Sequence, residues 1–366
     1  MPSDVQLMRL FAKEYVSARQ NLLDICEKME LEIESRAITE NGPHEEALTT
    51  DFVWYGPRDA SRLILHSSGV HGVEGYPGSA AQVWILEALR SGELSLPDDT
   101  AFAFIHIVNP WGMAWLRRVN EDNADLNRNF LPPGEEYTGE PEHYARLDAF
   151  LNPKTPAKGS EFYTLKALWY STRLGFATAK QTVQEGQYNR PKALQFGGSK
   201  LANSSQHVLD WLGENLVNAK KVIWFDFHTG LGPFGVDSLL VSESADKESL
   251  KQSYGNRIQV LDPSKSVAYR IRGGIQAGVE ARWPDIEWTS ITQEFGTIKP
   301  IPLLRLARAE NRLTQWSGKP PMALLRSKER QAMLNGFSPP SDKWRRMILN
   351  RSRAIVKDAI AELTKN

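Results

Sequence analysis

The chain has 366 residues, with 44 Lys and Arg against 44 Asp and Glu, so its formal net charge is zero. This length suits one large domain or two of ordinary size, and the 41% of hydrophobic residues allows a sizeable core. Because general nucleic-acid binding needs a basic surface, the neutral balance predicts no nucleic-acid partner.

Cysteine content and the pattern of the N-terminus bear on the compartment. Cys26 is the single cysteine, so no intrachain disulfide can form, which fits a reducing compartment. Residues 1–30 alternate charged and apolar side chains and lack the apolar core of a signal peptide. No stretch approaches the roughly 20 apolar residues of a membrane span. We therefore expect a soluble, cytoplasmic protein that has no membrane partner.

The spacing of apolar residues predicts alternating helices and strands. Residues 7–38 have apolar residues at helical spacing, which predicts one or two amphipathic helices and a helical segment over residues 1–40. Strands are expected at 51–54, 62–66, 101–108, 221–227, 237–241 and 288–295. Further helices are expected at 78–89, 163–180, 202–218, 274–282 and 344–363. This alternation predicts a three-layer α/β/α fold.

His71 and Glu74 follow the apolar run 63–65, in the sequence GVHGVE. A strand that ends in a Gly-rich turn places the next side chains at the carboxyl edge of the sheet, where ligands of open α/β sheets bind. Zn²⁺ accepts imidazole nitrogen and carboxylate oxygen, and a catalytic site typically uses three such ligands. A lone HxxE pair is better explained as ordinary turn residues, so the metal interpretation needs a third partner.

A second buried-strand pattern, residues 221–227, ends at His228. If the two strands are parallel, His228 lies at the same edge of the sheet as His71. His71, Glu74 and His228 then form the two-His, one-Glu set of a hydrolytic zinc site. The competing interpretation of His228 is a strand-end histidine that is hydrogen-bonded to a loop carbonyl.

Two further segments carry charged residues of catalytic interest. Residues 109–130 contain Arg117, Arg118 and Arg128, whose planar donor forks suit carboxylates and oxyanions, although most Arg-rich loops are simply solvated. Glu294 lies near the end of the β-branched run 288–295, where a carboxylate near a metal would serve as general base. The alternative for Glu294 is a surface residue at the end of a strand.

The ordered series HxxE, NPxG, Arg, DLNRNF, strand-end His and strand-borne Glu resembles the zinc carboxypeptidase superfamily. That superfamily includes the carboxypeptidase A-like peptidases and the succinylglutamate desuccinylase and aspartoacylase branch. The segments GVHGVEGYPGS, GQYNRPKALQFGG, DFHTGLG and QEFGT are most similar to a bacterial branch of it. The resemblance extends from His71 to Glu294, and it implies a mixed, mostly parallel central sheet and one Zn²⁺ per chain.

The resemblance also implies roles for the residues around the metal. His71, Glu74 and His228 match the three metal ligands. Asp125 matches the carboxylate that orients the first histidine. Glu294 matches the general base and acid.

Other matches concern the substrate. Arg118 matches the arginine that polarises the scissile carbonyl, and the adjacent Arg117 is an alternative for that role. Asn127 and Arg128 match the pair that binds a substrate carboxylate. Tyr269 lies where the peptidases often have a tyrosine that caps the substrate, although this match is weak.

Together these observations predict one zinc carboxypeptidase-like catalytic domain over residues 1–366, with a long insertion at 131–220 near the cleft. We expect a zinc-dependent hydrolase that cleaves an amide bond next to a carboxylate-bearing residue of a small peptide. An N-acyl amino acid deacylase of the desuccinylase or aspartoacylase type is the alternative, and an inactive zinc-binding module is the alternative from another class. Trp111 departs from the pattern, since the peptidases usually have Asp there.

A literal GxGxxG occurs at residues 230–235, directly after the strand expected at 221–227. A dinucleotide-binding motif needs a helix after the glycines, so that the phosphates lie at its N-terminus. Residues 237–241 have the pattern of a strand instead, which favours a Gly-rich loop beside His228 over a nucleotide site.

Overall fold

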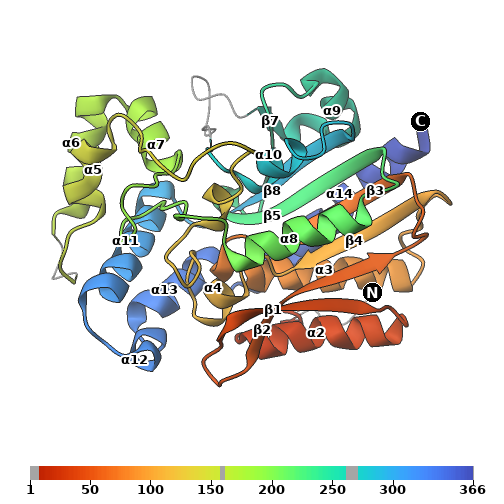
Figure 1. Cartoon of the computed structure of the whole chain (residues 1–366), viewed down its shortest axis with the longest axis horizontal. Helices are drawn as coiled ribbons and strands as arrows, with labels where there is room; N and C mark the ends of the chain where they lie inside the picture. Colours follow the sequence, from red (N-terminus) through yellow and green to blue (C-terminus); the bar gives the residue numbers. More distant parts are fainter. Residues whose placement is uncertain (1–7, 157–160, 261–270, 366) are drawn as a thin grey trace.

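The computed structural model describes residues 8–156, 161–260 and 271–365. Strands in this part of the chain form one sheet with the order β1-β2-β4-β3-β5-β8-β6-β7 (Figure 1). They are β1 (Ile33–Asn41), β2 (Ala47–Tyr55), β3 (Arg62–Ser68), β4 (Thr100–His106), β5 (Lys221–Phe234), β6 (Asp237–Val241), β7 (Ile258–Val260) and β8 (Glu287–Gly296).

Four adjacent parallel strands, β4, β3, β5 and β8, form the centre of the sheet. Antiparallel strands extend it on both sides, because β2 runs against β4 and β6 runs against β8. The predicted mixed, mostly parallel sheet is therefore confirmed. Since parallel strands share a carboxyl edge, the residues that follow β3, β5 and β8 meet at that edge.

Helices cover both faces of the sheet (Figure 1). On one face the core is completed by α2 (Tyr15–Lys28), α3 (Gly75–Arg90) and α14 (Asp342–Lys365), and on the other by α8 (Asn203–Asn215) and α10 (Ile275–Glu280). Side chains of β3 alternate between the two cores, with Ile64 in the first and Leu63 and Leu65 in the second. Burial on both faces explains the apolar runs in the sequence and confirms the three-layer fold.

Shorter helices gather at one end of the sheet, at the left of Figure 1, together with α11 (Pro300–Trp316). Helices α11 and α13 (Lys328–Phe337) pack against the second half of β5, where the Thr229 hydroxyl donates a hydrogen bond to the carbonyl of Phe337. The remaining helices are α4 (Pro110–Ala114), α5 (Tyr144–Leu151), α6 (Tyr163–Leu174), α7 (Phe176–Gln184), α9 (Lys247–Tyr254) and α12 (Pro321–Leu325). Within residues 131–220, α5 to α7 lie at this end, whereas α8 covers the sheet.

The N-terminal helical segment is shorter than the sequence predicts. Helix α2 ends at Lys28, Glu30 has a positive φ of 53°, and the chain then forms β1. The prediction of a helix up to residue 38, and of a helical segment up to residue 40, is therefore wrong for its last part. Pairing of β1 with β2 at the edge of the sheet overrides the helical spacing of its apolar residues.

The helix expected at 163–180 is also interrupted. Gly175 has a φ of 80°, a conformation that glycine adopts without steric cost, and it separates α6 from α7. The apolar spacing continues across the break, so the sequence pattern alone does not mark it.

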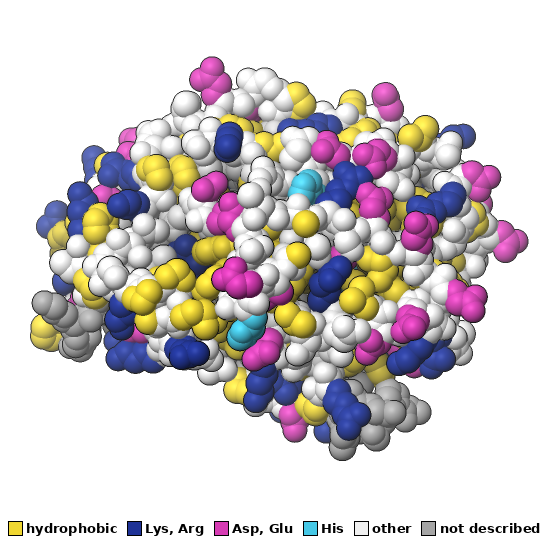
Figure 2. Space-filling view, turned by 60° about the horizontal axis from the view of Figure 1, so that its bottom comes forward, with side chains coloured by type: hydrophobic (Ala, Val, Ile, Leu, Met, Phe, Trp, Pro, Cys, Tyr) yellow, Lys and Arg dark blue, Asp and Glu magenta, His cyan; other side chains and the backbone are white. Residues whose placement is uncertain are grey.

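Among the described residues, no helix combines the length and the apolar character needed to cross a membrane. Figure 2 shows Lys and Arg side chains interspersed with Asp and Glu over the face that it presents, in line with the zero net charge. Interspersed charges of opposite sign produce no broad single-sign field over that face.

Candidate metal centre

His71 and Glu74 lie in a tight turn directly after β3. The chain turns at Gly69, which has a φ of 69°, and then forms the short 3₁₀ helix Gly72–Glu74 that leads into α3. A Cβ atom at Gly72 would lie 2.0 Å from the carbonyl carbon of Gly112 in α4. Only glycine fits this contact, and the close packing holds the turn at the carboxyl edge of the sheet.

His228 and Glu294 lie on neighbouring parallel strands. Strand β5 continues past His228 to Phe234, so His228 lies just beyond the carboxyl end of β3 and not, as the sequence predicted, at the end of its own strand. Glu294 lies near the carboxyl end of β8 and is paired directly in register with His228. Their side chains therefore emerge side by side at the same edge as His71. The backbone amide of Leu231 donates a hydrogen bond to Glu294 Oε1 over 2.7 Å, which holds that carboxylate in place.

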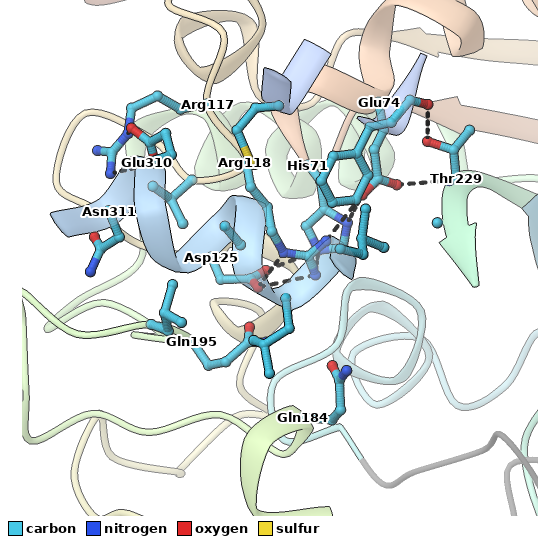
Figure 3. Close-up of a pocket in the computed structure, with 18 of the residues that line it drawn as sticks. His71, Glu74, Arg117, Arg118, Asp125, Gln184, Gln195, Thr229, Glu310 and Asn311 are labelled. Carbon is cyan, nitrogen blue, oxygen red and sulfur yellow. Dashed lines mark hydrogen bonds and ion pairs between the residues drawn. The ribbon is translucent and has the colours of Figure 1, made fainter. Parts of the chain in front are cut away.

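The three predicted metal ligands come together at this edge. One ligand atom from each of His71, Glu74 and His228 can be chosen so that all lie within 4.8 Å of one another. The Glu74 carboxylate lies between the rings, with Oε1 3.0 Å from His71 Nδ1 and Oε2 3.4 Å from His228 Nδ1. All three side chains are buried, and Figure 3 shows His71 and Glu74 pointing toward one another. Two imidazole nitrogens and a carboxylate oxygen are the donor set that Zn²⁺ prefers.

In each imidazole, Nδ1 faces Glu74 and is called the inner nitrogen here, whereas Nε2 is the outer nitrogen. Each outer nitrogen faces a second carboxylate. His71 Nε2 lies 3.1 Å from Asp125 Oδ1, and His228 Nε2 lies 2.6 Å from Asp226 Oδ2. The inner nitrogen of His71, Nδ1, is buried and makes no hydrogen bond. A carboxylate on the outer nitrogen orients a histidine so that its inner nitrogen faces the metal. The residues present therefore fit a zinc ion held by the two Nδ1 atoms and Glu74.

Asp226 was not predicted from the sequence, although a signal was available. It stands two residues before His228 on β5, and residues two apart on a strand share a face. Its second oxygen accepts a hydrogen bond from Ser67 Oγ over 2.6 Å, which fixes the carboxylate behind the histidine.

We expect Asp226→Asn to weaken Zn²⁺ binding about 10- to 100-fold, because an amide is a poorer partner for the outer nitrogen of His228. The dissociation constant, measured by competition with a chelator, checks this result. Asp237→Asn is a matched control, since Asp237 is equally buried but pairs with Arg257 and Arg351. Equal Zn²⁺ affinity in Asp226→Asn and the wild type would contradict the role of Asp226.

Burial and neighbouring charges shift the pKa values of Glu294, Glu74 and His228. Burial, and after it the negative charge of Glu74, raises the pKa of the Glu294 carboxyl to about 7. Burial also acts to raise the pKa of Glu74, but the positive charges and close contacts of His71 and His228 outweigh it and lower that pKa. For His228, burial lowers the pKa, whereas the charge of Asp226 and its hydrogen bond raise it to a net value above that of a free histidine. Glu294 is thus the carboxylate whose pKa suits proton exchange near neutrality.

The two adjacent arginines face different partners. Arg118 donates to Glu74 Oε1 over 3.0 Å and lies 3.3 Å from Asp125 Oδ2, so its guanidinium is beside the metal ligands. Arg117 donates to Glu310 Oε1 over 2.8 Å and points away from them, as Figure 3 shows. Of the two candidates for the oxyanion role, the geometry therefore favours Arg118.

Two of the residues predicted to bind substrate, Arg128 and Asn127, do not line the cavity that lies beside the candidate metal ligands. Arg128 is fully buried and donates to the carbonyls of Gln184, over 2.6 Å, and Asn127, over 2.8 Å. Asn127 lines a neighbouring cavity and accepts a hydrogen bond from the amide of Ile275. Tyr269 lies outside the described residues. The substrate-binding roles of these residues remain predictions.

A cavity of about 100 Å³ opens beside the candidate metal ligands. Gln184 and Gln195, both from the region expected as an insertion, line it together with Glu310 and Asn311 of α11. Sequence reasoning did not find these four residues, because no local motif places them near the metal ligands. The segment around Gln195 is tied to the site by a hydrogen bond from the Asp125 amide to the carbonyl of Phe196.

Comparisons with known proteins identify the family of the chain and show its fold. The sequence model of the family described as "Protein of unknown function (DUF2817)" matches residues 11–351. No curated protein matches the chain. The structure of thrombin activatable fibrinolysis inhibitor is similar with a TM-score of 0.50 and 14% identity, covering 96% of this chain and 74% of that chain. This similarity shows the fold, and it confirms the expected carboxypeptidase-like architecture.

Two further solved structures resemble the chain less closely. Carboxypeptidase A from Helicoverpa armigera has a TM-score of 0.45 and 11% identity, covering 87% of this chain and 74% of that chain. A succinylglutamate desuccinylase/aspartoacylase family protein from Shewanella amazonensis has a TM-score of 0.41 and 15% identity, covering 78% of this chain and 71% of that chain.

Proposed function

Since the chain belongs to the family described as "Protein of unknown function (DUF2817)", we propose its function from the site itself: a zinc-dependent hydrolase that cleaves an amide bond. The observation that carries the proposal is the convergence of His71, Glu74 and His228 around one buried point. Glu294 stands beside them, in register with His228 on the next strand. A metal-binding set next to a carboxylate with a raised pKa is the arrangement that hydrolysis needs.

His71, Glu74 and His228 would hold the ion, with Asp125 and Asp226 orienting the two imidazoles. When bound, the ion supplies Lewis acidity and lowers the pKa of water so that it can act as a nucleophile near neutral pH. Glu294 accepts a proton from the attacking water and donates it to the leaving nitrogen. Its raised pKa suits both transfers.

Arg118 would stabilise the negative charge that develops on the carbonyl oxygen of the substrate. Its guanidinium lines the cavity and lies within hydrogen-bonding distance of Glu74. A donor placed where charge develops is often the largest single contribution to such a reaction. Because Arg118 also lies 2.6 Å from His71 Nε2, a proton on that nitrogen would oppose the guanidinium. We expect Arg118 to turn toward the cavity when His71 binds metal.

The substrate we propose is a small peptide with a carboxylate next to the cleaved amide, and the reaction is that of a cytoplasmic carboxypeptidase. Arg128 and Asn127 would anchor the carboxylate, which requires Arg128 to exchange the Gln184 carbonyl for the substrate and Asn127 to turn from the neighbouring cavity toward the metal ligands. Orientation by such an anchor can lower the barrier by several kcal/mol. A deacylase acting on N-acyl amino acids is the second candidate, because its substrates present the same amide and carboxylate.

A substrate panel tests the proposal. The zinc-loaded protein is offered peptides with free C-termini, the same peptides amidated at the C-terminus, and N-acyl amino acids, with Glu294→Gln as the control in each assay. We expect hydrolysis of the free peptides and none of their amides. Cleavage of N-acyl amino acids alone would favour the deacylase. An intact metal site without hydrolysis of any amide or ester would contradict the proposal and indicate an inactive binding module.

A further inference from the structure

Arg117 is buried at the edge of the cavity and links helix α11 to the segment that precedes Arg118. Its side chain is 2% exposed. It forms a two-point ion pair with Glu310 of α11, from Nε to Oε1 over 2.8 Å and from Nη2 to Oε2 over 3.3 Å. Nη2 also donates to Asn123 Oδ1 over 2.9 Å. These bonds fix the guanidinium rigidly, facing away from the metal ligands.

The backbone of the same residues supports the turn that carries two metal ligands. The amide of Val73 donates to the Arg117 carbonyl over 2.9 Å, and the amide of Gly72 donates to the Arg118 carbonyl over 3.1 Å. Gly72 and Val73 are the two residues between His71 and Glu74. A shift of these two amides therefore moves both ligands at once.

Glu310 holds this supporting segment at more than one point. Besides Arg117, it accepts hydrogen bonds from Arg330 Nε of α13 over 3.2 Å and from Thr314 Oγ1 over 2.6 Å. Arg330 in turn donates to the carbonyl of Trp115 over 2.6 Å. One buried carboxylate thus connects α11 and α13 to the chain just before Arg118, from two sides.

We propose that Arg117 and Glu310 form a buried brace that positions the HxxE turn for metal binding. Arg117 is a positioning residue, since it acts through the backbone of residues 72 and 73. The inference rests on the metal site of the proposed function, but not on any substrate or on hydrolysis. Asp125 and Asp226 support the metal ligands by contacting the histidine rings. The Arg117–Glu310 ion pair would add a second kind of support, because it acts on the backbone of the turn.

Two variants test the brace, and they differ in whether they leave a buried charge without its partner, which is strongly destabilising. Arg117→Lys keeps the positive charge but loses the planar fork that makes two bonds to Glu310. Glu310→Gln keeps the shape of the acceptor but leaves the buried guanidinium groups of Arg117 and Arg330 without a carboxylate, so it is expected to lose more stability than Arg117→Lys. The two variants break the same contact from opposite sides, so each checks the other if one fails to fold.

Arg312→Lys is a matched control for Arg117→Lys, and Arg312 lies on α11, the helix that carries Glu310. Arg312 is equally buried on α11 and also pairs with a carboxylate, Glu161, over 2.6 Å. Its other hydrogen bonds go to Thr155 and Pro156, neither of which lines the cavity beside the metal ligands. Arg312→Lys therefore reports the loss of stability expected when any buried arginine that pairs with a carboxylate is replaced.

The test is the Zn²⁺ dissociation constant of each metal-free variant, measured by chelator competition, together with its melting temperature without metal. We expect Arg117→Lys and Glu310→Gln to bind Zn²⁺ about 10- to 100-fold more weakly than the wild type, as when the outer partners of metal ligands are altered. Arg312→Lys should lose comparable thermal stability with wild-type Zn²⁺ affinity. Wild-type affinity in both brace variants, or an equal loss in Arg312→Lys, would overturn the inference.

The result separates this inference from the proposed function. If the wild-type protein binds Zn²⁺ through His71 and the brace variants bind it equally well, the brace alone is wrong. If the wild-type protein does not bind Zn²⁺, both the brace and the proposed function are wrong. If Zn²⁺ affinity falls as expected but no substrate is hydrolysed, the brace stands and the proposed reaction does not.

Discussion

Replacing His71 with alanine is expected to remove the zinc ion and the hydrolytic activity together. His71 contributes one of the three donors, and its buried Nδ1 has no hydrogen bond in the protein alone. With two donors left, the site no longer has the three protein ligands typical of catalytic zinc. Metal content per chain, measured after purification without added metal, and turnover on the same samples check this expectation. Both should fall to background.

His207→Ala is the control for this experiment. His207 is a half-buried histidine on α8, which covers the sheet away from the candidate metal ligands. It should keep full zinc content and wild-type turnover. A His71→Ala variant that retained zinc with wild-type affinity would show that the ion binds elsewhere.

Replacing Glu294 with glutamine is expected to leave the metal in place and to lower kcat by about 10²- to 10⁴-fold, the usual contribution of a general acid and base. Glutamine has nearly the same shape, and its side-chain oxygen can still accept the hydrogen bond from the Leu231 amide. It has no carboxylate to accept a proton. Steady-state kinetics and metal analysis on one preparation separate the two effects.

Glu280→Gln provides the comparison for Glu294. Burial also raises the pKa of the Glu280 carboxyl, but that residue lies on α10 and lines other cavities. Its amide variant should turn over substrate as the wild type does. Normal turnover by Glu294→Gln would refute the assignment of the proton transfer to Glu294.

The residues that meet at the metal centre could be predicted because strand periodicity and sheet direction decide their position. His71, His228 and Glu294 each end or follow a run of apolar or β-branched residues, and β3, β5 and β8 are parallel. Residues at the carboxyl ends of adjacent parallel strands lie side by side whatever the sequence between them. Local pattern was therefore enough to bring together residues that are far apart in the chain.

Residues whose position depends on long-range contacts were not predicted in the same way. Arg117 and Glu310 are 193 positions apart, and neither has a local pattern that points to the other. The DLNRNF motif locates Arg128 on the chain, but its guanidinium direction is decided by the Gln184 carbonyl, 56 positions away. Strand β1 shows the same limit, since its partner at the edge of the sheet overrides its helical spacing.

The most direct test of the account is a crystal grown with zinc and measured at the zinc absorption edge. We predict one anomalous peak at bonding distance, about 2.0–2.1 Å, from Nδ1 of both His71 and His228, with a Glu74 oxygen as the third protein ligand. A peak that leaves His228 out of the coordination sphere, or crystals with zinc in the medium and no peak at this point, would contradict the account.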